Sequence, residues 1–136
     1  MAISQVFTCD RCGAQAGRVA LYARGEVTPG RTRHEIDSVT SAMDNSGAER
    51  ARVQVESDVV NVTMFEFDVA ATLSALSVGD ARALHKLDLE FVPFWCPPCG
   101  AAFCGRHWVT WDLFDDGFFD EKRGRCPAGH ERRLFD

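Results

Sequence analysis

The sequence predicts an α+β fold, a single small β-rich domain over residues 1–136 with a long insertion near its start. Three observations support this prediction. The 136 residues suit one domain, and 46% hydrophobic and 26% charged residues are typical of a globular chain. Alternating and β-branched segments fill much of the first half. Each of the six cysteines lies a few residues from another cysteine or a histidine. This spacing indicates that links between side chains supplement the modest apolar core of a small chain.

All six cysteines and two of the four histidines form four pairs: Cys9/Cys12, Cys96/Cys99, Cys104/His107 and Cys126/His130. Residues two or three positions apart can point into one ion, and thiolate and imidazole are the donors that Zn²⁺ favours in closed structural sites. The eight donors therefore predict two tetrahedral zinc sites. Segments 7–14 and 94–101 echo each other, each with a glycine after its second cysteine where a zinc knuckle needs positive φ. Disulfides would leave the neighbouring histidines unexplained.

The spacing leaves three ways to distribute the pairs between two ions. In a nested arrangement the second and third pairs share one ion, and in a sequential arrangement the first and second pairs do. In an interleaved arrangement the first pair joins the third and the second joins the fourth. We favour the interleaved form, because the turns at 96–99 and 126–130 both begin Cys-Pro and the 26 residues between them suit a strand–turn–strand ribbon.

The ligand-bearing segments, 7–14 and 94–130, resemble the cross-brace zinc fingers of the RING and AN1 types. The second C-x2-C pair is followed by a run from Cys99 to His107 that reads C-x4-C-x2-H. This run resembles that of the AN1 fingers. The resemblance implies a cross-brace or zinc-ribbon-like domain. It also implies that Cys9, Cys12, Cys104 and His107 bind one zinc and Cys96, Cys99, Cys126 and His130 the other. The chain departs from that pattern in the long segment 13–95 and in its final C-x3-H pair.

The insertion, residues 13–95, is expected to be β-rich, and residues 94–136 to form the zinc-finger region. We expect strands over 19–27, 53–67 and 87–91, a long mobile loop over 30–52, and a phase change near Ser57 that indicates a turn or bulge. Between 69 and 85, leucines at near-helical spacing predict two short helices that break at Gly79, with Ser77 and Asp80 as candidate caps.

Aromatic residues concentrate late in the chain, where all three tryptophans and six of the ten phenylalanines lie between positions 91 and 119. They could pack as a small core around the metal loops. Alternatively, part of them forms a patch for a protein partner. The candidates for that surface are Trp108, Trp111, Phe114, Phe118 and Phe119. Acidic residues surround them, including pairs at 115–116 and 120–121 that suit a turn around Gly117.

These features favour a zinc-binding protein–protein interaction module. A net charge of −5 disfavours nucleic acid as partner, and no apolar run is long enough to cross a membrane. The first residues lack a secretory signal, so we expect a cytoplasmic protein. Both zinc ions would be saturated, His34 and His85 belong to no motif, and we find no catalytic signature. Two alternatives remain: a RING-like E3 component of a ubiquitin-like pathway, and a nucleic-acid-binding zinc ribbon.

Overall fold

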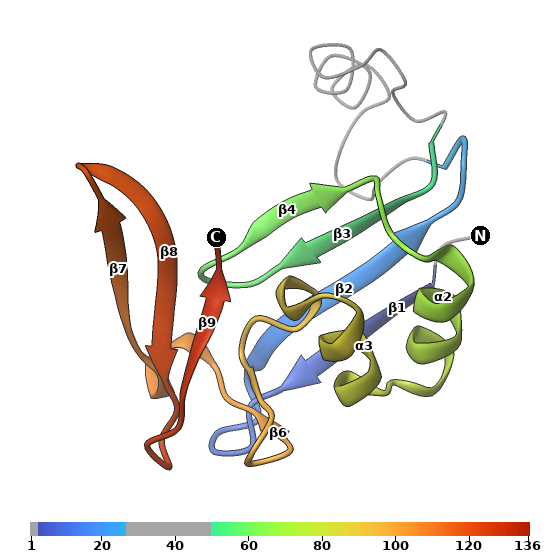
Figure 1. Ribbon diagram of the computed structural model, residues 1–136. Coiled ribbons are helices and arrows are strands. Elements are labelled where there is room, and N and C mark those ends of the chain that lie inside the picture. Colours follow the sequence, from blue (N-terminus) through green and yellow to red (C-terminus); the bar gives the residue numbers. More distant parts are fainter. Residues whose placement is uncertain (1–2, 27–49) are drawn as a thin grey trace.

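The first half of the chain forms a four-stranded antiparallel sheet. The computed structural model describes residues 3–26 and 50–136 (Figure 1). The strands lie in the order β1-β2-β3-β4. Their bounds are Ile3–Thr8, Gln15–Tyr22, Arg52–Glu56 and Asn61–Met64. Val19 pairs with Val55 and Leu21 with Val53, so these β-branched and aliphatic side chains share one face of the sheet.

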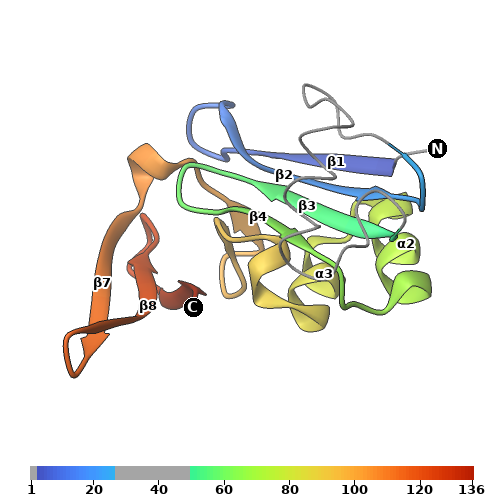
Figure 2. The same cartoon turned by 90° about the horizontal axis from the view of Figure 1, so that it is seen from above.

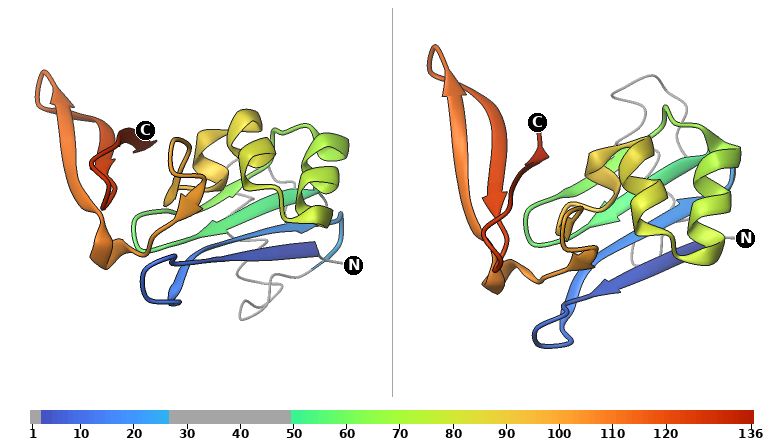
Figure 3. Two further views of the ribbon diagram at one scale, coloured as in Figure 1. Left: turned by 90° about the horizontal axis from the view of Figure 1, so that it is seen from below. Right: turned by 60° about the horizontal axis from the view of Figure 1, so that its bottom comes forward.

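Two helices, α2 (Val69–Val78) and α3 (Ala81–Leu87), cover that face, as Figures 2 and 3 show. Leu76 and Leu84 are fully buried in the same apolar cluster as the sheet valines. Gly79 ends α2 in the left-handed conformation, and the Asp80 carboxylate accepts a hydrogen bond from a backbone N–H of the first turn of α3. This confirms the predicted break. Within the described residues, no helix is long and apolar enough to cross a bilayer.

The second half adds two small sheets. After the 3₁₀ turn η2 (Leu89–Phe91), β5 (Trp95–Cys96) pairs with β6 (Ala101–Ala102). A second 3₁₀ turn, η3 (Gly105–His107), leads to a three-stranded sheet in the order β7-β8-β9. These strands span Val109–Asp115, Phe118–Arg125 and Glu131–Phe135. The β7–β8 hairpin stands away from the larger sheet (Figures 1 and 2).

The hairpin turns at Asp116 and Gly117, which have φ values of 49° and 82°. Two consecutive positive φ angles are the mark of a type I′ turn, whose twist matches that of the paired strands. The predicted turn around Gly117 is therefore confirmed, with the acidic residue Asp116 at one of its two central positions. The strand–turn–strand unit between the second and fourth ligand pairs is also confirmed.

The base of the hairpin packs on the rest of the chain through a few large residues. Trp108 is buried, stacks on Phe94 with ring centroids 5.8 Å apart, and donates its Nε1–H to the Phe103 carbonyl at 2.8 Å. Leu134 of β9 is fully buried beside it. Gly124 of β8 faces both side chains, because a Cβ there would lie 2.9 Å from Leu134 Cδ1 and 3.0 Å from Trp108 Cε3.

Several predicted boundaries need correction. The first predicted strand starts earlier and ends at Tyr22. Residues 87–91 are not a strand: Leu87 ends α3 and residues 89–91 form η2. Their apolar side chains do not share one buried face, since Leu87 is 40% exposed while Phe91 is 2% exposed. The turn near Ser57 is confirmed, since the Ser57 hydroxyl accepts from the Val60 N–H at 3.0 Å between β3 and β4. Most of the predicted loop 30–52 lies outside the described residues, and β1 was not predicted.

Replacing Gly124 by alanine should destabilise the base of the hairpin. The new Cβ would overlap two side chains that are already buried, and overpacking of this kind costs about 1–3 kcal/mol. Urea unfolding of the metal-loaded protein measures the loss. Thr110→Ala, at the exposed cross-strand partner of Gly124, is the matched control and should cost less. Equal stability of the Gly124 variant and the wild type would contradict this packing.

Candidate metal centre

Two tight turns present the C-x2-C pairs in the same way. In the turn between β1 and β2, the Gly13 N–H donates to the Cys9 carbonyl at 2.9 Å, and Gly13 has φ 75°. In the turn between β5 and β6, the Gly100 N–H donates to the Cys96 carbonyl at 2.8 Å, and Gly100 has φ 62°. The two segments that are similar in sequence therefore form the same turn. Each has a glycine at the position whose positive φ would strain any residue with a side chain.

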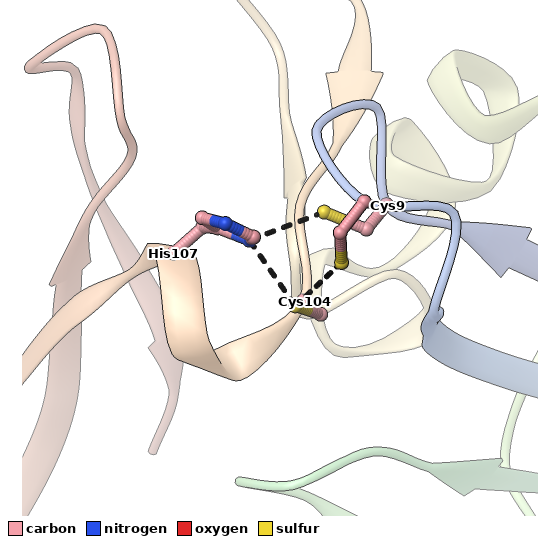
Figure 4. A group of neighbouring side chains, drawn as sticks. Cys9, Cys104 and His107 are labelled. Carbon is pink, nitrogen blue, oxygen red and sulfur yellow. Dashed lines mark hydrogen bonds between the residues drawn. The ribbon is translucent and has the colours of Figure 1, made fainter.

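The first group of donors joins the β1–β2 turn to η3. Its members are Cys9, Cys12, Cys104 and His107, and their ligand atoms all lie within 4.8 Å of one another. The His107 Nδ1 atom faces the sulfurs of Cys104 at 3.2 Å and Cys9 at 3.4 Å (Figure 4). The Cys12 and Cys104 sulfurs are 3.6 Å apart. Segments more than ninety positions apart in the sequence thus meet at one point.

The second group joins the β5–β6 turn to the β8–β9 turn. Its members are Cys96, Cys99, Cys126 and His130, again within 4.8 Å of one another. The Cys126 sulfur lies 3.7 Å from that of Cys96 and 3.8 Å from that of Cys99. The His130 Nδ1 atom lies 3.2, 3.6 and 3.5 Å from the sulfurs of Cys99, Cys96 and Cys126. The structure thus groups the pairs in the interleaved way.

These distances match the edges of a metal tetrahedron. Zn–S bonds of about 2.3 Å and Zn–N bonds of about 2.0 Å give edges of about 3.8 Å between sulfurs and about 3.5 Å between sulfur and nitrogen. The observed S···S separations of 3.6–3.8 Å and N···S separations of 3.2–3.6 Å lie close to these values. A disulfide would need about 2.0 Å, and all six cysteines are free. Both groups could hold a metal ion.

Backbone N–H groups favour the thiolate form at the first cysteine of two pairs. Burial tends to raise the pKa of Cys9, but the N–H groups facing its sulfur outweigh burial and the pKa falls to about 6. In the same way, the N–H groups of His130 and Ala128 outweigh burial and lower the pKa of Cys126 to about 7. Burial prevails at Cys96 and raises its pKa to about 12. An ion bound by the second group must therefore displace the Cys96 proton.

The two groups are linked mechanically. Only four residues separate Cys99 of the second group from Cys104 of the first, and β6 lies between them. The Asp10 N–H, in the first turn, donates to the Ala102 carbonyl of β6 at 2.8 Å. The chain through β6 and this hydrogen bond therefore connect the two groups directly.

Arg132 is a structural residue that the sequence analysis missed. Its buried guanidinium donates from Nη1 to the carbonyls of Val92 at 2.8 Å and Trp95 at 2.5 Å, and from Nη2 to that of Leu89 at 2.9 Å. Burial lowers its pKa to about 10. Arg132 thus ties β9 to the segment that enters the β5–β6 turn. The alternation of side chains along β9 could have revealed this, because Arg132 lies two residues from Leu134 and on the same buried face of the strand.

A second missed residue, Arg106, lies beside the first group. One of its Nη atoms is 3.8 Å from the Cys12 sulfur, and the nearby thiolates of Cys104 and Cys12 raise the pKa of the guanidinium. A divalent ion bound by three thiolates and one neutral imidazole would leave a net charge of −1 beside this cation.

Only some of the five aromatic residues predicted to form a surface are exposed. Trp108 must be removed from it, because this side chain is 6% exposed and packs in the core. Trp111 is partly buried under Arg125, whose guanidinium carbon is 5.6 Å from the ring centroid. Phe114, Phe118 and Phe119 are 64%, 76% and 44% exposed on the hairpin.

The two histidines without a motif stay outside both groups of donors. His85 lies in the last turn of α3, with its ring 5.5 Å from that of Trp95. Burial and the nearby charges of Arg132 and Arg82 lower its pKa. His34 lies outside the described residues.

Arg132→Met should destabilise the protein by about 2–4 kcal/mol, because it leaves three carbonyl groups without their buried donor. Urea unfolding of the metal-loaded variant gives the value. Arg133→Met removes only the exposed ion pairs to Glu121 and Asp136 and should cost under about 1 kcal/mol. Similar losses in the two variants would show that Arg132 does not hold the segments together.

Comparisons with known proteins place the whole chain in one family. A search among curated proteins and a search among solved structures found no match. A protein-family model described as Domain of unknown function (DUF8328) matches residues 2–136. This match spans both groups of donors and the sheets between them. The chain therefore belongs to the DUF8328 family.

Proposed function

We propose that each group binds one Zn²⁺ ion as a closed structural site and that the protein is an interaction module that binds a partner through its hairpin. The observation that carries the proposal is the pair of complete Cys₃His sets, each with the edge lengths of a zinc tetrahedron. The two ions fix the base of the hairpin to the four-stranded sheet.

The donor chemistry supports zinc and a structural role. Thiolate and imidazole suit Zn²⁺, whereas Mg²⁺ and Ca²⁺ prefer oxygen ligands. Four protein donors fill the tetrahedron, so no position is left for the water that a catalytic zinc would activate. Apparent binding free energies of structural zinc are about 10–16 kcal/mol, comparable with the whole stability of a typical domain.

The hairpin supports the interaction role. Phe114, Phe118 and Phe119 expose much of their rings although the domain has a core elsewhere, and clustered exposed apolar groups mark contact surfaces. The acidic residues between them disfavour the nucleic-acid alternative, because they would repel phosphate. No contact in the described residues favours the ligase alternative.

Double substitutions should reveal the interleaved zinc pairing. The wild type should hold two zinc ions, and Cys104→Ser should lose one. Cys9→Ser/Cys104→Ser removes two ligands of one group and should still hold one ion, whereas Cys96→Ser/Cys104→Ser damages both groups and should hold none. Elemental analysis of the purified proteins counts the metal, and cobalt absorption reports thiolate coordination.

His34→Ala is the control for these variants and should keep both ions. Loss of both ions from the Cys9/Cys104 variant, with one ion kept by the Cys96/Cys104 variant, would contradict the interleaved pairing. Metal-free native protein would overturn the zinc proposal itself.

The interaction role predicts that partner capture depends on the hairpin. Phe114→Ser/Phe118→Ser should abolish the capture of a specific protein from extracts of the native host, because it removes the most exposed aromatic groups. The matched control is Leu73→Ser/Val78→Ser, which removes two exposed apolar side chains from α2 and should capture the same protein. Quantitative mass spectrometry compares the captures, with zinc content checked in each variant. Identical captures by both variants would refute the role of the hairpin.

A further inference from the structure

Strand β7 has a free edge. In the three-stranded sheet it pairs with β8 alone, so along the described chain its outer backbone groups have no strand partner. The extra residue of the register shift, Asp120, lies on β8, and this leaves β7 regular over seven residues. Natural edge strands are usually short, bulged or charged, and lysine and proline block pairing most effectively. β7 contains no lysine or proline, and its two charged residues, Asp112 and Asp115, are acidic and leave pairing with a basic strand open.

The side chains of β7 also suit an added strand. Six of its seven residues are exposed, and they include Val109, Leu113 and Phe114. Phe114 continues into an aromatic row, with its ring centroid 6.3 Å from that of Phe119, which lies 5.8 Å from that of Phe135. A strand placed beside β7 would cover apolar groups on both faces of the sheet.

The same segment accounts for the net charge of the chain. Residues 109–121 contain five acidic side chains and no basic one, while the whole chain has a net charge of −5. The remaining residues therefore carry fifteen acidic and fifteen basic side chains and are neutral overall. The negative charge of the protein is thus concentrated on residues 109–121, while Lys122, Arg123 and Arg125 follow at the end of β8.

Most of these acidic groups are not neutralised within the fold. Asp112 pairs with Lys122 at 2.6 Å, and Glu121 pairs with Arg123 at 3.3 Å. Asp115, Asp116 and Asp120 form no ion pair in the part of the chain that the structure describes. Three carboxylates beside exposed phenylalanines call for positive charge from another molecule.

We propose that β7 binds an extended, basic and apolar segment of a partner protein as a fourth strand of the sheet. The inference rests on the proposed interaction role and specifies the chemistry of the partner. Backbone hydrogen bonds along the edge supply affinity, and lysine or arginine beside Asp115, Asp116 and Asp120 supplies selectivity. A second copy of this chain is a poorer occupant, because antiparallel pairing centred on Asp112 would bring two acidic hairpins together.

The probe is a short fluorescent peptide of alternating lysine and valine, added to the zinc-loaded full chain. We expect micromolar binding by fluorescence anisotropy that weakens with salt, and slower amide hydrogen exchange within Val109–Asp115. Two further peptides separate the contributions. One replaces lysine by glutamate and should not bind. The other is N-methylated at alternate residues, which removes strand donors while keeping the charge, and should also fail.

Protein variants test the charge. Asp115→Asn/Asp116→Asn removes two negative charges, and asparagine tolerates the positive φ of Asp116, so the turn is retained. We expect binding at least about tenfold weaker in this variant. The matched control, Glu56→Gln/Glu66→Gln, removes two charges from the other half of the chain and should bind like the wild type. Zinc content confirms that each variant is folded.

Each outcome decides between the proposals. Equal binding of the N-methylated peptide would overturn strand addition, because only general charge attraction would remain. Concentration-dependent dimerisation lost in Phe114→Ser/Phe118→Ser would assign the edge to a second copy. If hairpin-dependent capture from extracts succeeds while the basic peptide does not bind, this inference fails and the interaction role stands. If neither occurs, both fail.

Discussion

The fold depends on two Cys₃His groups that join distant parts of the chain. The four-stranded sheet and its helices bury valines and leucines against one another and have a core of their own. The three-stranded sheet has far less, with Leu134 alone fully buried among its residues. Besides Trp108 and Arg132, the donors at either end of the hairpin, His107 before β7 and Cys126 after β8, connect it to the rest of the chain. A metal ion bound at each group would supplement the small apolar area that this sheet buries.

Interleaving makes the two groups act as one unit. In a nested arrangement one ion would close the local loop from Cys96 to His107, and only the other ion would connect that region to the β1–β2 turn. Here the first group reaches back to the β1–β2 turn, while the second group holds the turn between β8 and β9. β6 lies between the groups and hydrogen-bonds the first turn through Ala102. Donors of both groups therefore lie at the base of the hairpin, and its exposed tip extends away from them.

The sequence predicted those features that local chemistry determines. Ligand pairs, the break at Gly79 with its Asp80 cap, and the turn at Gly117 each depend on a few neighbouring residues. The prediction failed where tertiary contacts decide: residues 87–91 alternate like a strand but belong to helical turns, and the Leu89 carbonyl there accepts a hydrogen bond from Arg132 of β9. Arg132 looks like one more surface arginine until β9 places it beside Leu134. Trp108 looked like part of a surface because nothing in its neighbourhood reveals Phe94.

The basic and acidic residues of the hairpin region lie at different distances from the two groups of metal donors. Each bound Zn²⁺ would leave a net charge of −1, and arginines at the base of the hairpin, such as Arg106, lie where they offset it. The acidic tip lies at the opposite end of β7 and β8 from these groups and neutralises nothing there. Clustered like charges destabilise a folded chain. Turn formation at Asp116 and Gly117 requires one residue tolerant of positive φ and a glycine, not five carboxylates. Asp112 and Glu121 form ion pairs within the fold, but the carboxylates of Asp115, Asp116 and Asp120 form none in the described residues, and recognition of a positively charged partner is the role that we propose for them.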